Sequence, residues 1–578
     1  MAPTDQLQEV KIMLHGTAAS EGIGIGKVML IEEHSLEYTP RTVTDTEAES
    51  QRFKAAVDAF CYNTEKQAEN LRSSAGEKEA EILAGHIQII KDPYLSGEIE
   101  KLIAGGQCAE SALEHMCDMF IAMFSAADDE LTKQRAADVR DIKSGVLGIL
   151  LGVNEIKVSD APKGTVLVAR ELTPSVTAGI VKENIAGIIT ETGGTTSHSA
   201  ILARALEIPA VLSVEGVASS LKNGDTVVVD GSEGAVIVNP DDNTVAEYSK
   251  KRDAFLAERK ELENYRGRET KSASGEVYEL FCNIGKPEDA VKAVDADGEG
   301  VGLFRTEFLF MDRTSIPTED EQFEAYKKAA LILKGKSLII RTLDIGGDKD
   351  IPYLGLEKEE NPFMGFRAIR YCLKNRELFK SQIKAILRAS AFGDIKIMFP
   401  LITTMDELRE GKKLVAECKA DLRNMGINFN ENIQVGVMVE TASAAVIADM
   451  LAKEADFFSI GTNDLTGYTM ACDRGNNDVS YLYSPLQPSV LRMIKRTIEC
   501  GVQNGISVGM CGEAAANKLM IPLLISFGLT EFSVSAPSVL NVRKIISTWT
   551  KEEADKVTAK VLEMSTQQEI VEYLNSVV

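Results

Sequence analysis

One histidine of this chain lies where a glycine- and threonine-rich turn runs into an apolar helical pattern. The stretch GIITETGGTTSHSAILARALEIPAV, residues 187–211, contains His198, one of five histidines in 578 residues. Glycine turns and the free amides of a helix N-terminus bind anions, so an imidazole beside them could carry a phosphoryl group. The alternative is a histidine that caps or packs against the helix start. The remaining histidines lack this context, although His86 could contribute to a partner surface: His15, His34, His86 and His115.

Polar and charged residues follow many of the short apolar runs in the second half of the chain. They are Arg305, Arg341, Asp344, Glu440, Asn463, Asp464 and Cys511, together with Arg367 and Arg370 in NPFMGFRAIR and Arg474 in ACDRGNN. Guanidinium groups pair with carboxylate or phosphate oxygens. Two carboxylates with a nearby amide suit Mg²⁺, whereas zinc is not favoured because no HxxxH pattern or Cys/His cluster is present. The sequence therefore predicts an anion site that also binds Mg²⁺.

Cys511 lies among small residues in GMCGEA, at the end of one of these runs. A thiol titrates near pH 8.5 when unperturbed, and it could protonate a carbon centre or attack an electrophile. The alternative is a buried strand cysteine, which is the usual environment of a free cysteine.

A nucleotide site is not predicted. EGIGIGKV at 21–28 resembles a P-loop, but Glu21 occupies the first glycine position and Val28 the Ser/Thr position. The phosphoryl donor therefore need not be ATP.

The apolar runs of the second half alternate with helix-length segments. Eight runs occur, at 278–283, 300–304, 337–343, 395–400, 434–440, 457–462, 507–511 and 531–535. Eight strand–helix units over about 300 residues predict a (β/α)8 barrel, whose reactive side chains lie at the C-terminal ends of the strands. The alternative is an open doubly wound sheet.

The first half combines two kinds of pattern. Strand patterns with glycine turns occupy 10–31 and 157–240, and amphipathic helical patterns fill the segment between them. We therefore expect an α/β domain, residues 1–37 and 153–240, that contains an inserted helical subdomain at 38–152. The charged segment 241–272 predicts a solvated linker helix before the barrel at 273–578.

Composition excludes several classes of protein. The net charge is −24 and no basic run offsets it, so nucleic-acid binding is not expected. The longest nearly apolar run, LMIPLLISFGL at 519–529, is too short to span a bilayer, and the N-terminus does not look like a secretion signal. Nine scattered cysteines without a CxxC pair predict reduced thiols and a cytoplasmic protein.

Seven motifs, in order, carry a resemblance to a known family. GGTTSHSAILAR resembles the phosphohistidine signature of Enzyme I of the bacterial sugar phosphotransferase system, the phosphoenolpyruvate–protein phosphotransferase. GLFRTEFLFM, RTLDIGGDK, NPFMGFRAIR, VMVETASA, IGTNDLTGY and GMCGEAA are similar to its barrel motifs, and GTAASEGIGIGKV also fits. The resemblance covers essentially the whole chain.

The resemblance implies a role for each matching position. His198 would be phosphorylated on Nε2, and Cys511 would protonate the enol carbon as pyruvate forms. Glu440 and Asp464 would ligate Mg²⁺. The inserted helices would dock the phosphocarrier protein HPr, and the barrel would form a homodimer. Phosphoenolpyruvate would be held by Arg305, Arg341, Arg367, Asn463, Asp464 and Arg474. The reaction would be the first step of sugar uptake, and His198 would swing between its two partners about 241–272.

Two related enzyme classes are alternatives to this interpretation. Pyruvate phosphate dikinase and phosphoenolpyruvate synthase share a similar histidine domain and barrel, but they need an ATP-binding domain before the histidine, where this sequence predicts a helical hairpin. A nitrogen-type regulatory paralogue would run the same chemistry and would commonly add an N-terminal sensory domain. A catalytically idle scaffold is a third possibility, against which His198 and Cys511 both count.

Overall fold

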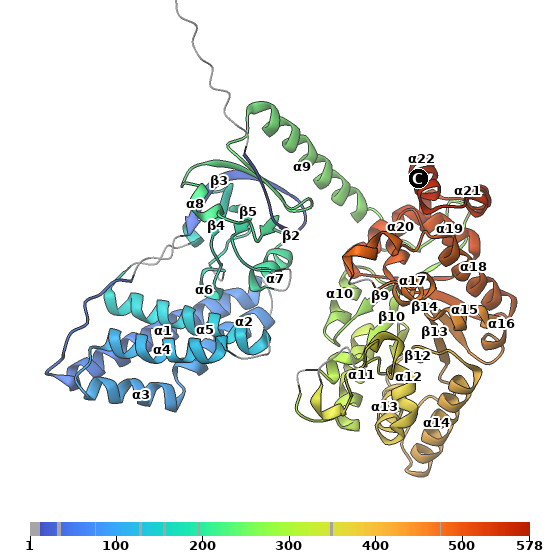
Figure 1. Cartoon of the computed structure of the whole chain (residues 1–578), viewed down its shortest axis with the longest axis horizontal. Helices are drawn as coiled ribbons and strands as arrows, with labels where there is room; N and C mark the ends of the chain where they lie inside the picture. Colours follow the sequence, from blue (N-terminus) through green and yellow to red (C-terminus); the bar gives the residue numbers. More distant parts are fainter. Residues whose placement is uncertain are drawn as a thin grey trace, which may run out of the picture. The chain divides into compact units, whose positions relative to one another are not determined.

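The computed structural model divides the chain into two compact units, Met1–Arg259 and Lys260–Val578 (Figure 1). It describes residues 12–31, 36–74, 77–126, 130–153, 158–177, 179–194, 197–311, 313–346, 351–473 and 476–578.

An eight-stranded mixed sheet organises the first unit. Its strand order is β1-β8-β7-β3-β4-β5-β6-β2, so β3 from the N-terminal segment pairs in parallel with β4, which comes more than a hundred residues later. Alternating valine and isoleucine side chains of these strands are buried on both faces. The strands are β1 (Ile12–His15), β2 (Thr17–Ser20), β3 (Ile23–Ile31), β4 (Thr165–Ala169), β5 (Ile185–Thr190), β6 (Ala210–Leu212), β7 (Thr226–Asp230) and β8 (Ala235–Val238).

In the described part of the segment between β3 and β4, five α-helices form their own apolar core around Phe53, Leu113 and Ile142. The start of the third is fixed by Asp92, whose carboxylate accepts the Tyr94 and Leu95 amides ahead of a proline at the first helical position. The helices are α1 (Thr46–Ser74), α2 (Glu77–Ile90), α3 (Pro93–Ala104), α4 (Ala109–Ser125) and α5 (Glu130–Leu151).

Short helices complete the α/β part of this unit. Helix α6 (Pro174–Thr177) contacts α2 and α5, while α7 (His198–Ala205) and α8 (Val217–Ser220) pack on the sheet. The α/β domain with a helical insertion is therefore as predicted.

Helix α9 (Asp242–Glu263) leads from the sheet toward the second unit. Tyr248 packs against Val228 and Ile237, whereas most of the remaining side chains of α9 are exposed. The helix ends at Glu263, before the predicted limit at 272, and a turn containing Gly267, with a φ of 71°, follows it.

The second unit is a closed parallel barrel, which confirms the predicted (β/α)8 architecture and excludes the open sheet. Its strands are β9 (Glu279–Ile284), β10 (Gly300–Arg305), β11 (Leu338–Arg341), β12 (Ile395–Phe399), β13 (Val435–Val439), β14 (Phe457–Ile460), β15 (Ser507–Met510) and β16 (Glu531–Val534). All eight coincide with the predicted apolar runs, because strands buried on both faces read as continuous apolar stretches.

The barrel interior is packed with side chains. A buried cluster of Leu303, Ile339, Met398, Met438, Phe457 and Cys511 forms one group of contacts there. A larger cluster lies between the strands and the surrounding helices. These are α10 (Asp289–Asp295), α11 (Glu319–Leu333), α12 (Ala368–Lys374), α13 (Arg376–Ala389), α14 (Met405–Asn424), α15 (Ala442–Val446), α16 (Ala448–Leu451), α17 (Thr462–Met470), α18 (Pro488–Gln503), α19 (Ile521–Phe527), α20 (Val539–Thr548), α21 (Lys551–Glu563) and α22 (Gln567–Val577).

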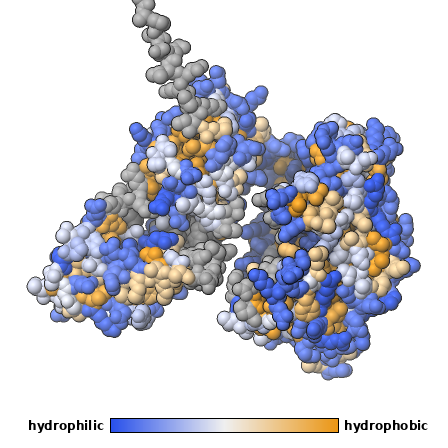
Figure 2. All heavy atoms as spheres, in the orientation of Figure 1, coloured by the Kyte–Doolittle hydropathy of each residue, from blue (hydrophilic) through white to orange (hydrophobic). Residues whose placement is uncertain are grey.

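Hydrophilic residues cover much of the visible face of both units (Figure 2). Within the described ranges, no helix has both the length and the apolar character needed to cross a membrane.

Candidate active site

Neighbouring strands of the barrel end in a pair of arginines. Arg305 at the end of β10 and Arg341 at the end of β11 are direct partners in the parallel register. Burial and the nearby Arg341 guanidinium lower the pKa of Arg305, although its side chain remains partly open to solvent. Two cations held side by side in this way favour the binding of an anion.

Arg341 is held by carboxylates on two sides. Its Nη2 lies 2.9 Å from Glu307 Oε1, and its Nη1 lies 2.9 Å from Asp344 Oδ2. Burial by itself would lower the pKa of Arg341, but Glu307 and Asp344 outweigh burial and raise it. Among the described atoms, Arg341 Nε is buried without a hydrogen-bond partner, so one donor remains for a ligand.

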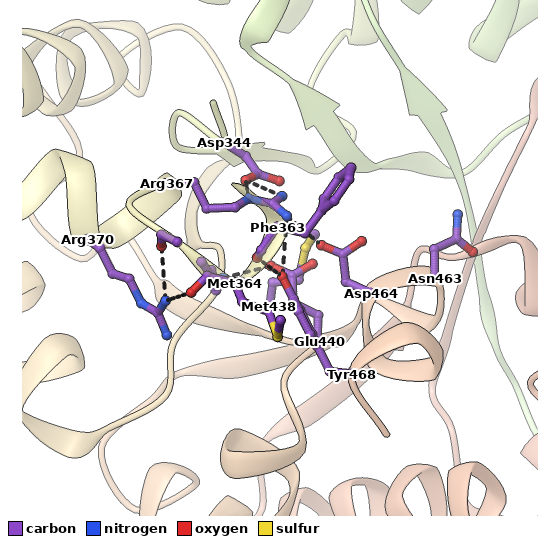
Figure 3. Close-up of polar contacts among 12 residues, drawn as sticks. Asp344, Phe363, Met364, Arg367, Arg370, Met438, Glu440, Asn463, Asp464 and Tyr468 are labelled. Atoms are coloured by element: carbon purple, nitrogen blue, oxygen red, sulfur yellow. Dashed lines mark hydrogen bonds and ion pairs between the residues drawn. The ribbon is translucent and has the colours of Figure 1, made fainter. Parts of the chain in front are cut away.

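Asp344 pairs with Arg341 and also with a second arginine, Arg367, and Figure 3 shows the contact between Asp344 and Arg367. Arg367 Nη2 lies 2.7 Å from Asp344 Oδ1, and Arg367 Nη1 lies 3.3 Å from Asp464 Oδ2. Burial opposes the charge of Arg367, but Asp344 and Asp464 raise its pKa above the ordinary value. The contacts form a continuous chain of charges from β11 across to the first turn of α17.

Glu440 lies just beyond the end of β13 and is only 2% exposed. Its Oε1 accepts the Leu401 amide at 2.7 Å. Burial raises the pKa of Glu440 well above its usual value, and the negative charges of Asp464 and Asp344 raise it further. Arg341 and Arg367 act in the opposite direction, but they do not outweigh burial, so a bound cation would favour the ionised form of Glu440.

Two residues with left-handed backbone lie beside these groups. Leu401, with a φ of 55°, presents the amide that binds Glu440, and Ala368, with a φ of 51°, directly follows Arg367. Residues other than glycine adopt this backbone conformation at a cost of about 1 kcal/mol or more. The surrounding packing therefore holds both segments in strained positions that orient the charged groups.

Cys511 follows β15 and is 3% exposed. Its thiol lies 3.7 Å from the Ile460 carbonyl oxygen, and burial raises its pKa to about 11. The group is therefore a protonated thiol near neutral pH. Asn283, the next-to-last residue of β9, donates to the Cys511 carbonyl at 3.0 Å and fixes the backbone at this position.

The residues present are consistent with a magnesium ion. Glu440 and Asp464 supply carboxylate oxygens, the donor type that Mg²⁺ prefers. The described side chains include no cluster of three or more histidine, cysteine, aspartate or glutamate residues able to hold a metal by themselves. Mg²⁺ commonly binds one or two carboxylates and completes its shell with water and substrate phosphate oxygens, so this donor set fits it.

The remaining predicted residues are placed as follows. Asn463 lies in the first turn of α17, where its carbonyl accepts the Tyr483 hydroxyl at 2.9 Å. The backbone of His198 begins α7, after the cap residue Ser197 and a turn in which Gly193 has a φ of 107°. The side chain of His198 and the whole of Arg474 lie outside the described residues.

Comparison with known proteins places this chain in a family. Models described as "PEP-utilising enzyme, N-terminal", "PEP-utilising enzyme, mobile domain" and "PEP-utilising enzyme, PEP-binding domain" match residues 15–135, 161–234 and 259–550. The phosphoenolpyruvate-protein phosphotransferase of Bacillus subtilis (strain 168) is 46% identical over 569 residues, covering 98% of this chain and 99% of the relative. The chain belongs to the phosphoenolpyruvate-protein phosphotransferase family.

Other members of the family match over a similar length. The phosphoenolpyruvate-protein phosphotransferase of Listeria innocua serovar 6a is 45% identical over 97% of this chain and 98% of its own length. That of Staphylococcus carnosus is 44% identical with the same coverage. The chain thus spans nearly the full length of these phosphotransferases, and the family resemblance predicted from its motifs is confirmed.

Sequence reasoning missed several residues at this family site. Glu307, two positions beyond Arg305, pairs with Arg341 and also accepts the Asp344 amide at 3.2 Å. Asn283 is the last residue of the predicted run 278–283 and the next-to-last residue of β9, so the strand-end rule applied to the other runs would have found it. Tyr468 does not lie at the end of a strand, so this rule could not indicate it, and its partners come from a separate part of the chain.

Proposed function

We propose that this chain transfers the phosphoryl group of phosphoenolpyruvate to His198 and then to the histidine of HPr, releasing pyruvate. This reaction would be the first step of sugar uptake by a phosphotransferase system. The observation that carries the proposal is the continuous network of Arg341, Asp344, Arg367 and Asp464 at one end of a barrel in a chain of this family.

The arginines account for substrate binding. Phosphoenolpyruvate carries a carboxylate and a phosphate, and guanidinium forks match both groups. Arg341 has a buried Nε without a described partner, and burial and the Arg341 charge, which both lower the pKa of Arg305, would be offset by a bound anion. We assign substrate binding to Arg305, Arg341, Arg367, Asn463, Asp464 and Arg474.

Glu440 and Asp464 would hold Mg²⁺. When bound, the ion neutralises charge on the substrate and on the crowded carboxylates, as phosphoryl transfer requires. The side chains of the barrel then orient the substrate. Because Arg341 and Arg367 are fixed by Asp344, little reorganisation is needed when charge develops on the transferring group.

Proton transfer is assigned to Cys511. As the bond between phosphorus and the enol oxygen breaks, a bond forms between phosphorus and a His198 nitrogen, and the enol oxygen becomes a carbonyl. The methylene carbon then takes a proton from the Cys511 thiol, which gives pyruvate and leaves a thiolate to be reprotonated from solvent. A thiol with a pKa of about 11 retains its proton at neutral pH and can act as this acid.

The first unit would receive the phosphoryl group and pass it on. Residues 1–37 and 153–240 form the phosphohistidine domain in this proposal, and the helical subdomain 38–152 docks HPr. His198 meets two partners in turn, so the domain is proposed to swing about 241–272. The barrel at 273–578 is proposed to mediate a homodimer, and the protein to act in the cytoplasm.

The proposal is tested by incubating the pure protein with radiolabelled phosphoenolpyruvate and Mg²⁺ in the absence of nucleotide. We expect acid-labile, alkali-stable label on the wild type, none on His198→Ala, and transfer of the label when HPr is added. Chelation of Mg²⁺ should prevent labelling. Label that comes only from ATP would favour a dikinase-like enzyme, and equal labelling of His198→Ala would refute the assigned acceptor.

A further inference from the structure

A short turn just before Arg367 borders a small pocket. A short 3-10 turn, Pro362–Met364, precedes Gly365, and the Phe363 and Met364 side chains are 38% and 64% exposed. The turn borders a pocket of about 140 Å³ that is also lined by Leu401, Thr441 and Tyr468. Because this pocket leaves one side of the turn unpacked, hydrogen bonds to the turn help to set its position, alongside the ion pairs of Arg367 with Asp344 and Asp464.

The Tyr468 hydroxyl provides two of these bonds (Figure 3). It donates a short hydrogen bond to the Phe363 carbonyl and accepts one from Arg367 Nη1 at 3.4 Å. Burial raises the pKa of Tyr468 to about 12, so the hydroxyl keeps the proton that it donates. The Phe363 ring lies 5.7 Å from the Arg367 guanidinium, so Tyr468, Phe363 and Arg367 all contact one another.

Arg370 holds the same turn from helix α12. Its Nη1 donates to the carbonyls of Met364 and Gly365, both at 3.0 Å. The backbone between Arg367 and Arg370 is fixed by the Ala368 amide, which donates to the Ile345 carbonyl at 3.2 Å. The carbonyl groups of the turn are therefore bound by two side chains, Tyr468 from α17 and Arg370 from α12.

We propose that Tyr468 is a positioning residue that fixes the Arg367 guanidinium for the substrate, with Arg370 as a second anchor of the same turn. This inference rests on the proposed function, in which Arg367 binds phosphoenolpyruvate. Arg367 Nη1 is shared between the Tyr468 hydroxyl and Asp464, at 3.4 and 3.3 Å. Without the hydroxyl, Asp464 is the only described partner of that nitrogen, and Arg367 moves toward the carboxylate and away from the substrate.

The direct test is Tyr468→Phe, which removes the hydroxyl and leaves the ring. Tyr371→Phe is the matched control, because the Tyr371 hydroxyl likewise donates to a backbone carbonyl, that of Leu354 at 3.0 Å, and has no arginine among its described hydrogen-bond partners. Loss of a hydrogen bond to a charged group corresponds to about a ten-fold change in binding. We expect Tyr468→Phe to raise KM for phosphoenolpyruvate about ten-fold while kcat changes less than about three-fold, and Arg370→Gln to act in the same direction.

Two further measurements separate the possible outcomes. The free energy of unfolding in urea should be the same for Tyr468→Phe and Tyr371→Phe. Equal increases in KM for both variants would overturn the proposal, because they would show that loss of either hydroxyl disturbs the barrel in a general way. Arg367→Lys serves as the reference for the binding site. If Arg367→Lys raises KM and Tyr468→Phe does not, the inference is wrong and the proposed function stands. If Arg367→Lys leaves KM unchanged, the assigned substrate role of Arg367 fails, and the inference fails with it.

Discussion

Replacing Glu531 with glutamine should remove a pH-dependent loss of stability from the barrel. Glu531 begins β16 and is 4% exposed, and its Oε1 has no hydrogen-bond partner among the described residues. Gly302 and Gly509 leave room for the carboxyl group, since a Cβ at these positions would lie 2.4 and 2.8 Å from Oε1. Burial raises the pKa of Glu531 from 4.5 to about 8, with Glu279 adding to the shift and Lys396 opposing it.

The sign and size of the effect follow from this pKa. Because the folded-state pKa is raised, the folded protein retains a proton that the unfolded chain has released, and folding is favoured most below the unfolded pKa of 4.5. This contribution is lost as pH rises toward the folded-state value near 8. The loss is about 1.4 kcal/mol per pH unit between about pH 5 and 8, and about 4 to 5 kcal/mol in total.

The assay uses the single tryptophan of the chain, Trp549, which packs against the barrel core and therefore reports unfolding of the second unit alone. Urea unfolding is followed by its fluorescence at pH 5, 6, 7 and 8. The free energy of unfolding of Glu531→Gln minus that of the wild type should increase with pH at the stated slope. The exposed Glu563→Gln serves as the control and should give a difference that does not change with pH. A constant difference for Glu531→Gln would refute the reasoning, because it would mean that the buried carboxyl is ionised throughout.

Three other predictions concern single side chains. Iodoacetamide should alkylate Cys511 far more slowly than an unperturbed thiol at pH 8, because a pKa raised from 9.0 to about 11 leaves roughly 90-fold less thiolate at that pH; mass spectrometry that finds Cys511 modified at the rate of free cysteine would contradict this. Arg543→Met should destabilise the barrel by about 3 kcal/mol, since it removes the buried cation paired with Asp297; a change below about 1 kcal/mol in Trp549-detected unfolding would argue against the pairing. Asp464→Asn should raise the Mg²⁺ concentration needed for half-maximal labelling of the protein at least about ten-fold, the loss expected when a metal ligand is weakened, and an unchanged requirement would remove Asp464 from the proposed ligands.

Much of the barrel and of its site could be predicted from the sequence. The eight strands were found because each is buried on both faces and is therefore a short apolar run between helical patterns. The strand-end rule then indicated Arg341, Asp344 and Glu440, since parallel strands of a closed barrel bring their C-terminal ends together. The helical insertion was likewise visible, because the hydrophobic period changes from two residues to 3.6 at its borders.

Only the tertiary structure decided which of these groups contact one another. That Asp344 joins Arg341 to Arg367, that Glu307 supports the same arginine and that Tyr468 holds the Phe363 carbonyl are contacts between segments up to about a hundred residues apart. Local patterns report whether a side chain is buried and on which element it lies. They do not report its partner, because the partner is set by how neighbouring strands align in the closed barrel and by where its loops fold over the strand ends.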